Sequence, residues 1–206
     1  MTDLALLGGT PAKRKPFPPW PQYDAREAEA LQQVLESRIW WRTPGTQTLR
    51  FEQAFASAHG AAHGIAVTNG THALEVAIAA LGIGYGDEVI VPDSTFIATA
   101  SAVLTAGALP VLVDVDMTTF NVDIARVEAA ITPRTRCIIA VHMGGLPVDM
   151  DALLLLAARH GIPVLEDSSH AHGSEWRGRR VGALGIAGPS SSQSSKTMTA
   201  GEGGII

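Results

Sequence analysis

The segment GDEVIVPDSTFIATASAVLTAGALPVLVDVD, residues 86–116, decides the fold class. An apolar run at 89–91 predicts a strand, residues 96–105 predict a helix, and 109–115 predict a second strand. A strand, a helix and a strand in this order are typical of parallel strands joined by a crossover helix. The segment therefore predicts an α/β protein with a mostly parallel central sheet and helices on both faces.

The same alternation extends in both directions from this segment. Apolar stripes predict helices over residues 24–37, 49–59, 72–81, 123–131 and 149–160. Short β-branched runs predict strands over 64–68, 137–142 and 162–165. Five prolines and two glycines between residues 8 and 22 predict an extended N-terminal arm over 1–22, followed by one domain over 23–206.

Composition limits the class of protein and its partners. Hydrophobic residues make up 46% of the chain and charged residues 17%, which predicts a large core rather than disorder. A formal net charge of −5 gives no electrostatic case for binding nucleic acid or an anionic membrane. The single cysteine, Cys137, lies in an apolar run and is interpreted as a buried structural thiol. With no predicted signal peptide or membrane span, we expect a cytoplasmic protein.

Ligands of parallel sheets lie beyond the carboxyl ends of the strands. This rule selects four places: Asn69-Gly70-Thr71, residues 93–96, His142, and residues 167–170. The glycine and threonine lie at a helix N-terminus, so this turn either binds a phosphate or is an ordinary helix cap. For His142, a structural role and a functional role remain equally open. The Gly82-x-Gly84-x-Gly86 loop leads from a helix into a strand and is therefore not a dinucleotide fingerprint.

Two polar stretches complete the candidate site. Asp167 follows an apolar strand, where a carboxylate can hold a proton on a cofactor's ring nitrogen. The stretch 167–172, DSSHAH, is an alternative metal site, but no other histidine or carboxylate has matching spacing, so we expect no metal. Residues 189–205, PSSSQSSKTMTAGEGGI, either form a flexible linker or hold Lys196 as a nucleophile in a cradle of small residues.

The order of these features matches what pyridoxal 5′-phosphate (PLP) requires. The phosphate needs donors, the ring needs an aromatic or apolar face, the ring nitrogen needs an acid, and the aldehyde needs a lysine. Each feature alone is a modest signal, but the chain provides all four in sequence.

Seven segments together resemble the DegT/DnrJ/EryC1/StrS family, the PLP-dependent aminotransferases of fold type I that act on keto-sugars and cyclitols. They are WWR (40–42), AVTNGTHAL (66–74), GDEVIVPDSTFIATASAV (86–103), GALPVLVDVD (107–116), VHMGGLPVDMDAL (141–153), PVLEDSSHAHGS (163–174) and SxxxxKxxxxGEGG (191–204). The N-terminal LALLGGTPA is similar to the scyllo-inosose aminotransferase branch, and WWR and HAHG are similar to the 3-amino-5-hydroxybenzoate synthase branch.

The resemblance implies a role for each matching residue. Lys196 would bind the PLP aldehyde and shuttle the proton, and Asp167 would pair with the pyridine nitrogen. The remaining cofactor contacts would come from Gly70, Thr71 and Ser191 at the phosphate, Phe96 on the ring, and His170 beside the ring hydroxyl. The amino donor would be glutamine or glutamate, the acceptor a keto-sugar or keto-cyclitol such as scyllo-inosose, and the protein a homodimer.

Three departures from the family pattern modify these expectations. Ser190 and Ser192 replace the usual aromatics around Ser191, which predicts a weaker strand below the ring. Ile186 replaces an acid. The chain also ends after GEGG, so we expect only the N-terminal part of the large domain, without the C-terminal small domain. Alternatives to the aminotransferase are a truncated or degenerate non-catalytic partner subunit and a dehydratase or aromatase of the same family.

Overall fold

The computed structural model describes residues 4–206, which divide into two units between Arg38 and Ile39. The first unit contains residues 4–22 of the expected arm, with the short helix η1 (Ala5–Leu7), and helix α1 (Ala25–Ser37). The predicted start of α1 is confirmed. The side chain of Asp24 accepts from the helix backbone, and Glu27 accepts from the backbone N–H of Asp24 at 2.8 Å.

The second unit follows the predicted alternation of strands and helices. Its helices are α2 (Gln47–His59), α3 (Gly70–Ala80), α4 (Ala98–Thr105), α5 (Ile124–Ala130) and α6 (Met150–His160), with the short helix η2 (Met143–Gly145). Its strands are β1 (Ala66–Val67), β2 (Glu88–Pro92), β3 (Leu109–Val113), β4 (Thr135–Val141), β5 (Val164–Asp167), β6 (Glu175–Trp176), β7 (Arg179–Arg180), β8 (Ser190–Ser191) and β9 (Gly204–Ile205).

Four strands form the parallel sheet that the sequence predicts. Their order is β3-β2-β4-β5, and every neighbouring pair is parallel. Next to β5 runs the segment 186–189, which bonds to it from Ile186 N to Val164 O at 2.8 Å and from Glu166 N to Ala187 O at 3.0 Å. This segment continues into β8, which pairs antiparallel with β9, and β9 pairs antiparallel with β1. The last strands of the chain therefore extend the sheet beyond β5.

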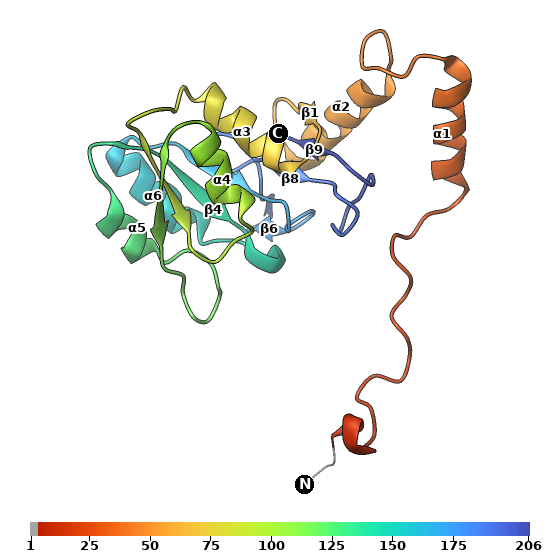
Figure 1. The fold of residues 1–206 in the computed structure, drawn as a ribbon, viewed down its shortest axis with the longest axis horizontal. Coiled ribbons are helices and arrows are strands. Elements are labelled where there is room, and N and C mark those ends of the chain that lie inside the picture. Colours follow the sequence, from red (N-terminus) through yellow and green to blue (C-terminus); the bar gives the residue numbers. More distant parts are fainter. Residues whose placement is uncertain (1–3) are drawn as a thin grey trace. The chain divides into compact units, whose positions relative to one another are not determined.

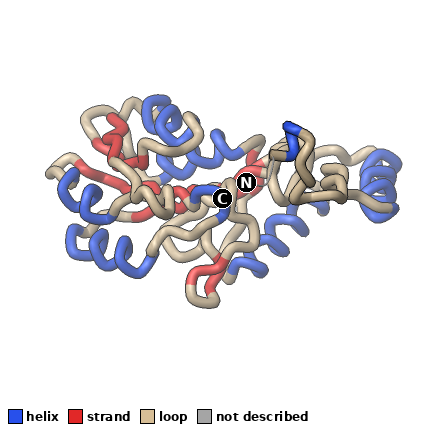
Figure 2. Tube along the Cα trace, turned by 90° about the horizontal axis from the view of Figure 1, so that it is seen from below, coloured by secondary structure: helices blue, strands red, loops and turns tan. Residues whose placement is uncertain are grey.

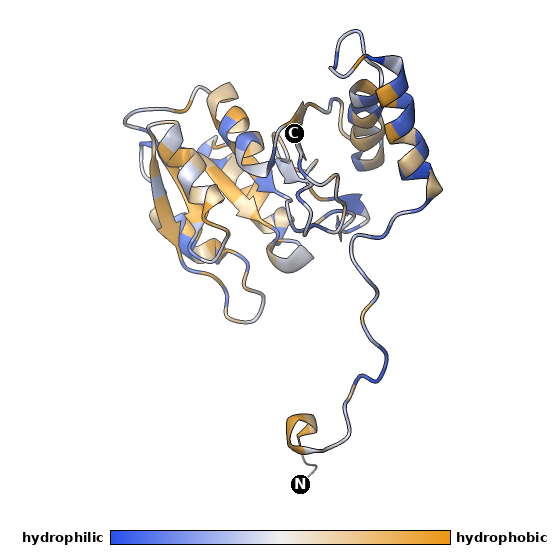
Figure 3. Ribbon diagram, turned by 45° about the vertical axis from the view of Figure 1, so that its right-hand side comes forward, coloured by the Kyte–Doolittle hydropathy of each residue, from blue (hydrophilic) through white to orange (hydrophobic). Residues whose placement is uncertain are grey.

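Helices cover both faces of the parallel sheet, as predicted (Figures 1 and 2). Alternating residues of β2 explain the two cores, because successive strand side chains point to opposite faces. Val89 and Val91 pack with residues of α3 and α4, whereas Ile90 packs with residues of α5 and α6. The strands are the most apolar part of this unit in Figure 3. Among the described residues, no helix is long and apolar enough to cross a membrane.

The structure differs from the sequence-based boundaries mainly around β1 and α3. Helix α3 begins at Gly70 rather than at residue 72, because the side chain of Asn69 accepts from His72 N at 2.8 Å and caps the helix there. Strand β1 is two residues long and antiparallel to β9, although we predicted five residues in a parallel sheet. The hairpin of β6 and β7 was not predicted, since its strands are too short to show a period.

Candidate functional site

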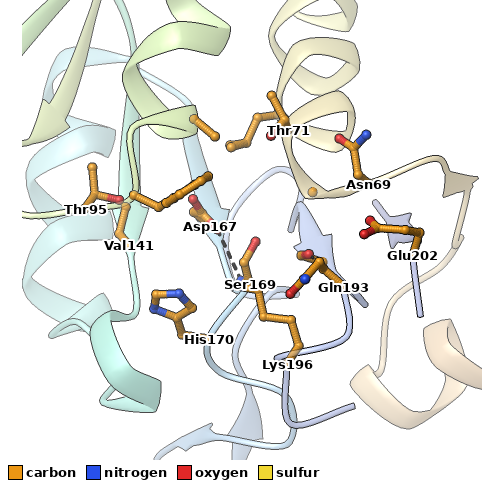
Figure 4. A pocket seen from close by; sticks show the side chains of 15 residues that line it. Asn69, Thr71, Thr95, Val141, Asp167, Ser169, His170, Gln193, Lys196 and Glu202 are labelled. Atoms are coloured by element: carbon orange, nitrogen blue, oxygen red, sulfur yellow. Dashed lines mark hydrogen bonds between the residues drawn. The ribbon is translucent and has the colours of Figure 1, made fainter. Parts of the chain in front are cut away.

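A cavity of about 270 Å³ lies at the carboxyl ends of the parallel strands, where the topology rule places a ligand (Figure 4). It is lined by Asn69, Gly70, Thr71, Leu74, Thr95, Phe96, Ala98, Val141, Asp167, Ser169, His170, Ser191, Gln193, Lys196 and Glu202. All seven predicted site residues are among them. The structure thus brings these residues together in one place, and their individual roles remain predictions.

The N-terminus of α3 packs directly on β8 at one end of the cavity. A Cβ atom added to Gly70 would lie 2.6 Å from Ser191 Cβ and 3.2 Å from Ser169 Oγ, so only glycine fits. This contact places the Ser191 and Ser169 hydroxyls beside the free backbone N–H groups of a helix N-terminus. Hydroxyl and N–H donors at the positive end of a helix form an anion site of the kind that binds phosphate.

The GEGG segment contributes Glu202 to the cavity, and close packing requires two of its glycines, which sequence reasoning did not explain. A Cβ on Gly204 would lie 2.5 Å from the backbone oxygen of Asn69, and one on Gly203 would lie 2.5 Å from Ser192 Oγ. The turn therefore presses against both the cap of α3 and the end of β8. Ser190, Ser191 and Ser192 are all buried, and β8 forms although both expected aromatics are absent.

Asp167 is buried and fixed at the end of β5, where it lines the cavity next to Ser169 (Figure 4). Its Oδ2 accepts from Thr99 Oγ1 at 2.9 Å, and its Oδ1 accepts from Ser169 N at 3.2 Å. Because each oxygen accepts one hydrogen bond from the chain, the remaining acceptor capacity of the carboxylate is available to a donor inside the cavity.

Lys196 and His170 come from different loops and face the same space. The Lys196 side chain is half-buried, and its backbone N–H donates to Gln193 O at 2.9 Å in a tight turn. Burial lowers the pKa of His170 below its ordinary value of 6.5, and the charge of Lys196 lowers that pKa further, against the opposing effect of Asp167. The lowered pKa favours the neutral imidazole near pH 7, which offers one donor and one acceptor nitrogen. Phe96 is 65% exposed at the cavity wall.

His142 has a structural role, which answers the question that the sequence left open. Its side chain is fully buried between Val148 N at 3.1 Å and Glu166 Oε2 at 3.1 Å, and it does not line the cavity. Glu166 also accepts from the backbone of Leu184 and Gly185 at 2.6 Å each. The pair thus anchors the loop that leads to β8.

His59, His63 and Cys137 do not line the cavity. Gly60 ends α2 in the left-handed conformation, and His59 stacks on Phe55 with the ring centroids 4.1 Å apart, while His63 is exposed. Among residues 4–206, no group of three or more His, Cys, Asp or Glu side chains is placed to hold a metal ion. Cys137 is buried, as predicted, and burial raises the pKa of its thiol to about 12, which disfavours the nucleophilic thiolate.

Sequence reasoning missed several polar residues of the cavity, namely Thr95, Ser169, Gln193 and Glu202. Thr95 and Ser169 lie within stretches that the strand-end rule had selected, so their positions were available from the sequence. Gln193 and Glu202 belong to the turns on either side of Lys196, and only the contacts of those turns with α3 and β8 bring them to the cavity.

The model of the DegT/DnrJ/EryC1/StrS aminotransferase family matches residues 21–206. The chain belongs to this family. The resemblance noted from its motifs is therefore confirmed over nine-tenths of its length, and with it the α/β fold of PLP-dependent enzymes of fold type I.

Two curated members of the family are close relatives of this chain. A 3-amino-5-hydroxybenzoate synthase from Amycolatopsis mediterranei is 52% identical over 95% of this chain and 50% of its own length. An L-glutamine:scyllo-inosose aminotransferase from Streptomyces griseus is 46% identical over 100% of this chain and 50% of its own. The chain spans about half the length of the curated relatives it matches.

Solved structures of family members show the same fold. The crystal structure of a 3-amino-5-hydroxybenzoic acid synthase matches with a TM-score of 0.90 and 52% identity, over 94% of this chain and 50% of that one. The PLP form of Spr1654 from Streptococcus pneumoniae matches with a TM-score of 0.86 and 31% identity, over 94% of this chain and 52% of that one.

PLP is the cofactor of the family, and the residues of this cavity fit it. The contact between Gly70 and Ser191 leaves an anion site with no room for another side chain. Asp167 offers an acceptor for a protonated ring nitrogen, and Lys196 offers an amine for the aldehyde. Phe96 also lines the cavity and would offer an aromatic face to the ring.

Proposed function

We propose that this chain forms the cofactor-binding part of a PLP-dependent aminotransferase that moves an amino group from glutamine or glutamate to a keto-sugar or keto-cyclitol. The observation that carries the proposal is the convergence in one cavity of Lys196, Asp167 and the anion site at Gly70 and Ser191. These groups come from four separate elements, and PLP needs all of them together.

Each residue of the cavity has a proposed role in the reaction. Bound PLP supplies an electron sink for the carbanion that transamination requires. Gly70, Thr71 and Ser191 hold the phosphate, and Asp167 keeps a proton on the ring nitrogen. Lys196, as a free amine, would take a proton from the Cα carbon of the amino donor and deliver it to the C4′ carbon of the cofactor.

Similarity to named relatives supports the substrate class. Relatives whose names specify L-glutamine and scyllo-inosose compounds are 43–49% identical over almost the whole chain. Neutral hydrogen-bonding side chains line much of the cavity, among them Asn69, Thr95 and Gln193, which suits a polyhydroxylated acceptor. This acceptor class also supports a place in amino-sugar or antibiotic biosynthesis.

Two alternatives rest on specific observations. The relative with 52% identity is a 3-amino-5-hydroxybenzoate synthase, which favours a dehydratase or aromatase reaction on the same cofactor. Ser190 and Ser192 stand where the family pattern has aromatics, which favours a degenerate, non-catalytic partner subunit. Both alternatives use the same cavity, so binding of PLP alone does not separate them.

We further propose that the protein is a homodimer in the cytoplasm. Helix α1 supports the homodimer, because none of its residues is buried within the first unit, and Leu31 and Leu35 are 72% and 62% exposed on one face of the helix. The cytoplasm is proposed because a chain with a single cysteine has no disulfide framework, which fits a reducing compartment.

Binding of PLP to the purified chain tests the proposed function. The wild-type chain is expected to develop a visible absorbance band with PLP, and borohydride reduction followed by peptide mass spectrometry should locate a pyridoxyl group on Lys196. Lys196→Ala should lose the band. Lys15→Ala, a change in the N-terminal arm, is the matched control and should keep it.

A folded wild-type chain without the band at saturating PLP would contradict the proposal. Turnover with scyllo-inosose and glutamine then separates the alternatives. Activity of the chain alone supports the aminotransferase. Activity only after mixing with a full-length relative that carries its own lysine-to-alanine change supports the partner subunit.

A further inference from the structure

Thr99 lies behind the cavity and contacts its key carboxylate. It is the second residue of α4, its side chain is fully buried, and it does not line the cavity. Its hydroxyl donates to Asp167 Oδ2 at 2.9 Å, a contact that joins residues 68 positions apart in the sequence. A second hydroxyl, Thr95 Oγ1, lies 2.9 Å from Thr99 Oγ1 and belongs to the cavity wall.

The direction of these hydrogen bonds follows from counting protons. A threonine hydroxyl carries one proton, and Thr99 uses it in the bond to Asp167. The hydrogen bond between the two threonines must therefore run from Thr95 to Thr99. Since Ser169 N donates to Asp167 Oδ1, donors approach both oxygens of the carboxylate, and its rotation is fixed.

We propose that Thr99 is a positioning residue: the chain of hydrogen bonds from Thr95 through Thr99 to Asp167 holds the carboxylate as an acceptor that faces the ring nitrogen of the cofactor. The hydrogen bonds are a feature of this chain, and the ring nitrogen that they serve rests on the proposed function. An aliphatic residue in place of Thr99 would fill the same volume but leave Asp167 Oδ2 buried without its donor.

Three substitutions distinguish a positioning role of the Thr99 hydroxyl from a role of the Thr99 side chain in packing alone. Thr99→Val keeps the branched shape and removes the donor, whereas Thr99→Ser keeps the donor and removes a methyl group. Thr95→Val breaks the chain one step further from Asp167. Each variant is titrated with PLP and with 1-deaza-PLP, in which a carbon replaces the ring nitrogen, so that the analogue cannot donate a proton to Asp167.

We expect Thr99→Val to weaken PLP binding about ten-fold, the effect of losing one hydrogen bond to a charged group, and to leave the binding of 1-deaza-PLP unchanged. Thr99→Ser should restore PLP binding, and Thr95→Val should show a smaller loss of the same selectivity. Equal losses for both ligands in Thr99→Val, or no loss for either, would overturn the inference.

A second measurement does not depend on the cofactor. A crystal structure of cofactor-free Thr99→Val should show the Asp167 carboxylate rotated away from its wild-type orientation, and an unchanged orientation would refute the positioning role. If the wild-type chain binds neither ligand, the proposed function fails, and this structure still decides whether Thr99 orients Asp167.

Discussion

At Gly70 the chain has no space for a side chain, because Ser191 lies against the backbone there. A methyl group at this position must push Ser191 away from the N-terminus of α3. We therefore expect Gly70→Ala to weaken PLP binding about ten-fold, as if one charge-assisted hydrogen bond were lost. The measurement is a fluorescence titration with PLP. Gly84→Ala is the matched control, since its new Cβ would meet only Ala106 O at an ordinary 3.7 Å.

Glu52 lies on α2, is 3% exposed, and links this helix to strand β1. It accepts from Arg42 Nη2 at 2.7 Å and from the backbone N–H of Ala66, the first residue of β1, at 3.0 Å. The hydrogen bond from Arg42 is the main reason why the pKa of Glu52 lies below its ordinary value of 4.5. The ionised carboxylate therefore holds the loop of Arg42 and the start of β1 on the helix.

The sign of the pH dependence follows from the lowered pKa. The pair stabilises the fold fully above pH 4.5, and this contribution is lost as pH falls through the lower pKa of the folded state. We expect Glu52→Gln to lower the free energy of unfolding at pH 7 by about 1–2 kcal/mol. The difference from wild type should shrink below pH 4.5.

Urea unfolding from pH 7 to pH 3 measures this difference. Glu75→Gln in α3 is the control, because Glu75 forms no ion pair within the part of the chain that the structure describes. If the difference in the free energy of unfolding between wild type and Glu52→Gln stayed constant from pH 7 to pH 3, the assigned role of the Glu52 charge would be contradicted.

The cap of α3 allows stability and ligand binding to be separated at one residue. Asn69→Ala removes the acceptor of His72 N and should lower the free energy of unfolding by about 1 kcal/mol. Asn69→Asp keeps an acceptor and suits the positive end of the helix, so it should retain the wild-type stability.

The new charge of Asn69→Asp would lie beside the anion site. It should therefore weaken PLP binding about ten-fold while the binding of pyridoxal, which has no phosphate, stays unchanged. Thermal unfolding measures the stability of each variant, and titrations with PLP and with pyridoxal measure the affinity for each ligand. Equal weakening of both ligands would show that the phosphate is not held at this helix end.

At the scale of the whole molecule, the exposed face of α1 bears on assembly. If α1 packs on a second copy, Leu31→Glu together with Leu35→Glu should convert a dimer into a monomer, because two buried charges cost more than the contact contributes. Analytical ultracentrifugation measures the change. Gln33→Glu adds a charge on the opposite face of α1 and should leave the mass unaltered. A double variant that stays dimeric would place the interface elsewhere.

Much of the fold followed from short-range signals. The predictions of the parallel strands and of the helices that cover them were correct. Buried strands are short, apolar and bounded by turns, and amphipathic helices repeat their apolar residues every three to four positions. Strands β8 and β9 could not be predicted from such local patterns. Each has two residues, and the serines of β8 resemble a linker until β9 and the α3 N-terminus lie beside them.

The sequence by itself determined the fold class and the family, and it predicted which residues would serve PLP, because motif order and strand-end position are local properties of the chain. Only the tertiary structure decided that His142 supports Glu166 rather than the cavity, that Gly70 and Gly204 are steric requirements, and that Thr99 reaches Asp167. The physical reason is the same in each case. These are contacts between residues far apart in sequence, and their existence depends on close packing at the edge of the sheet.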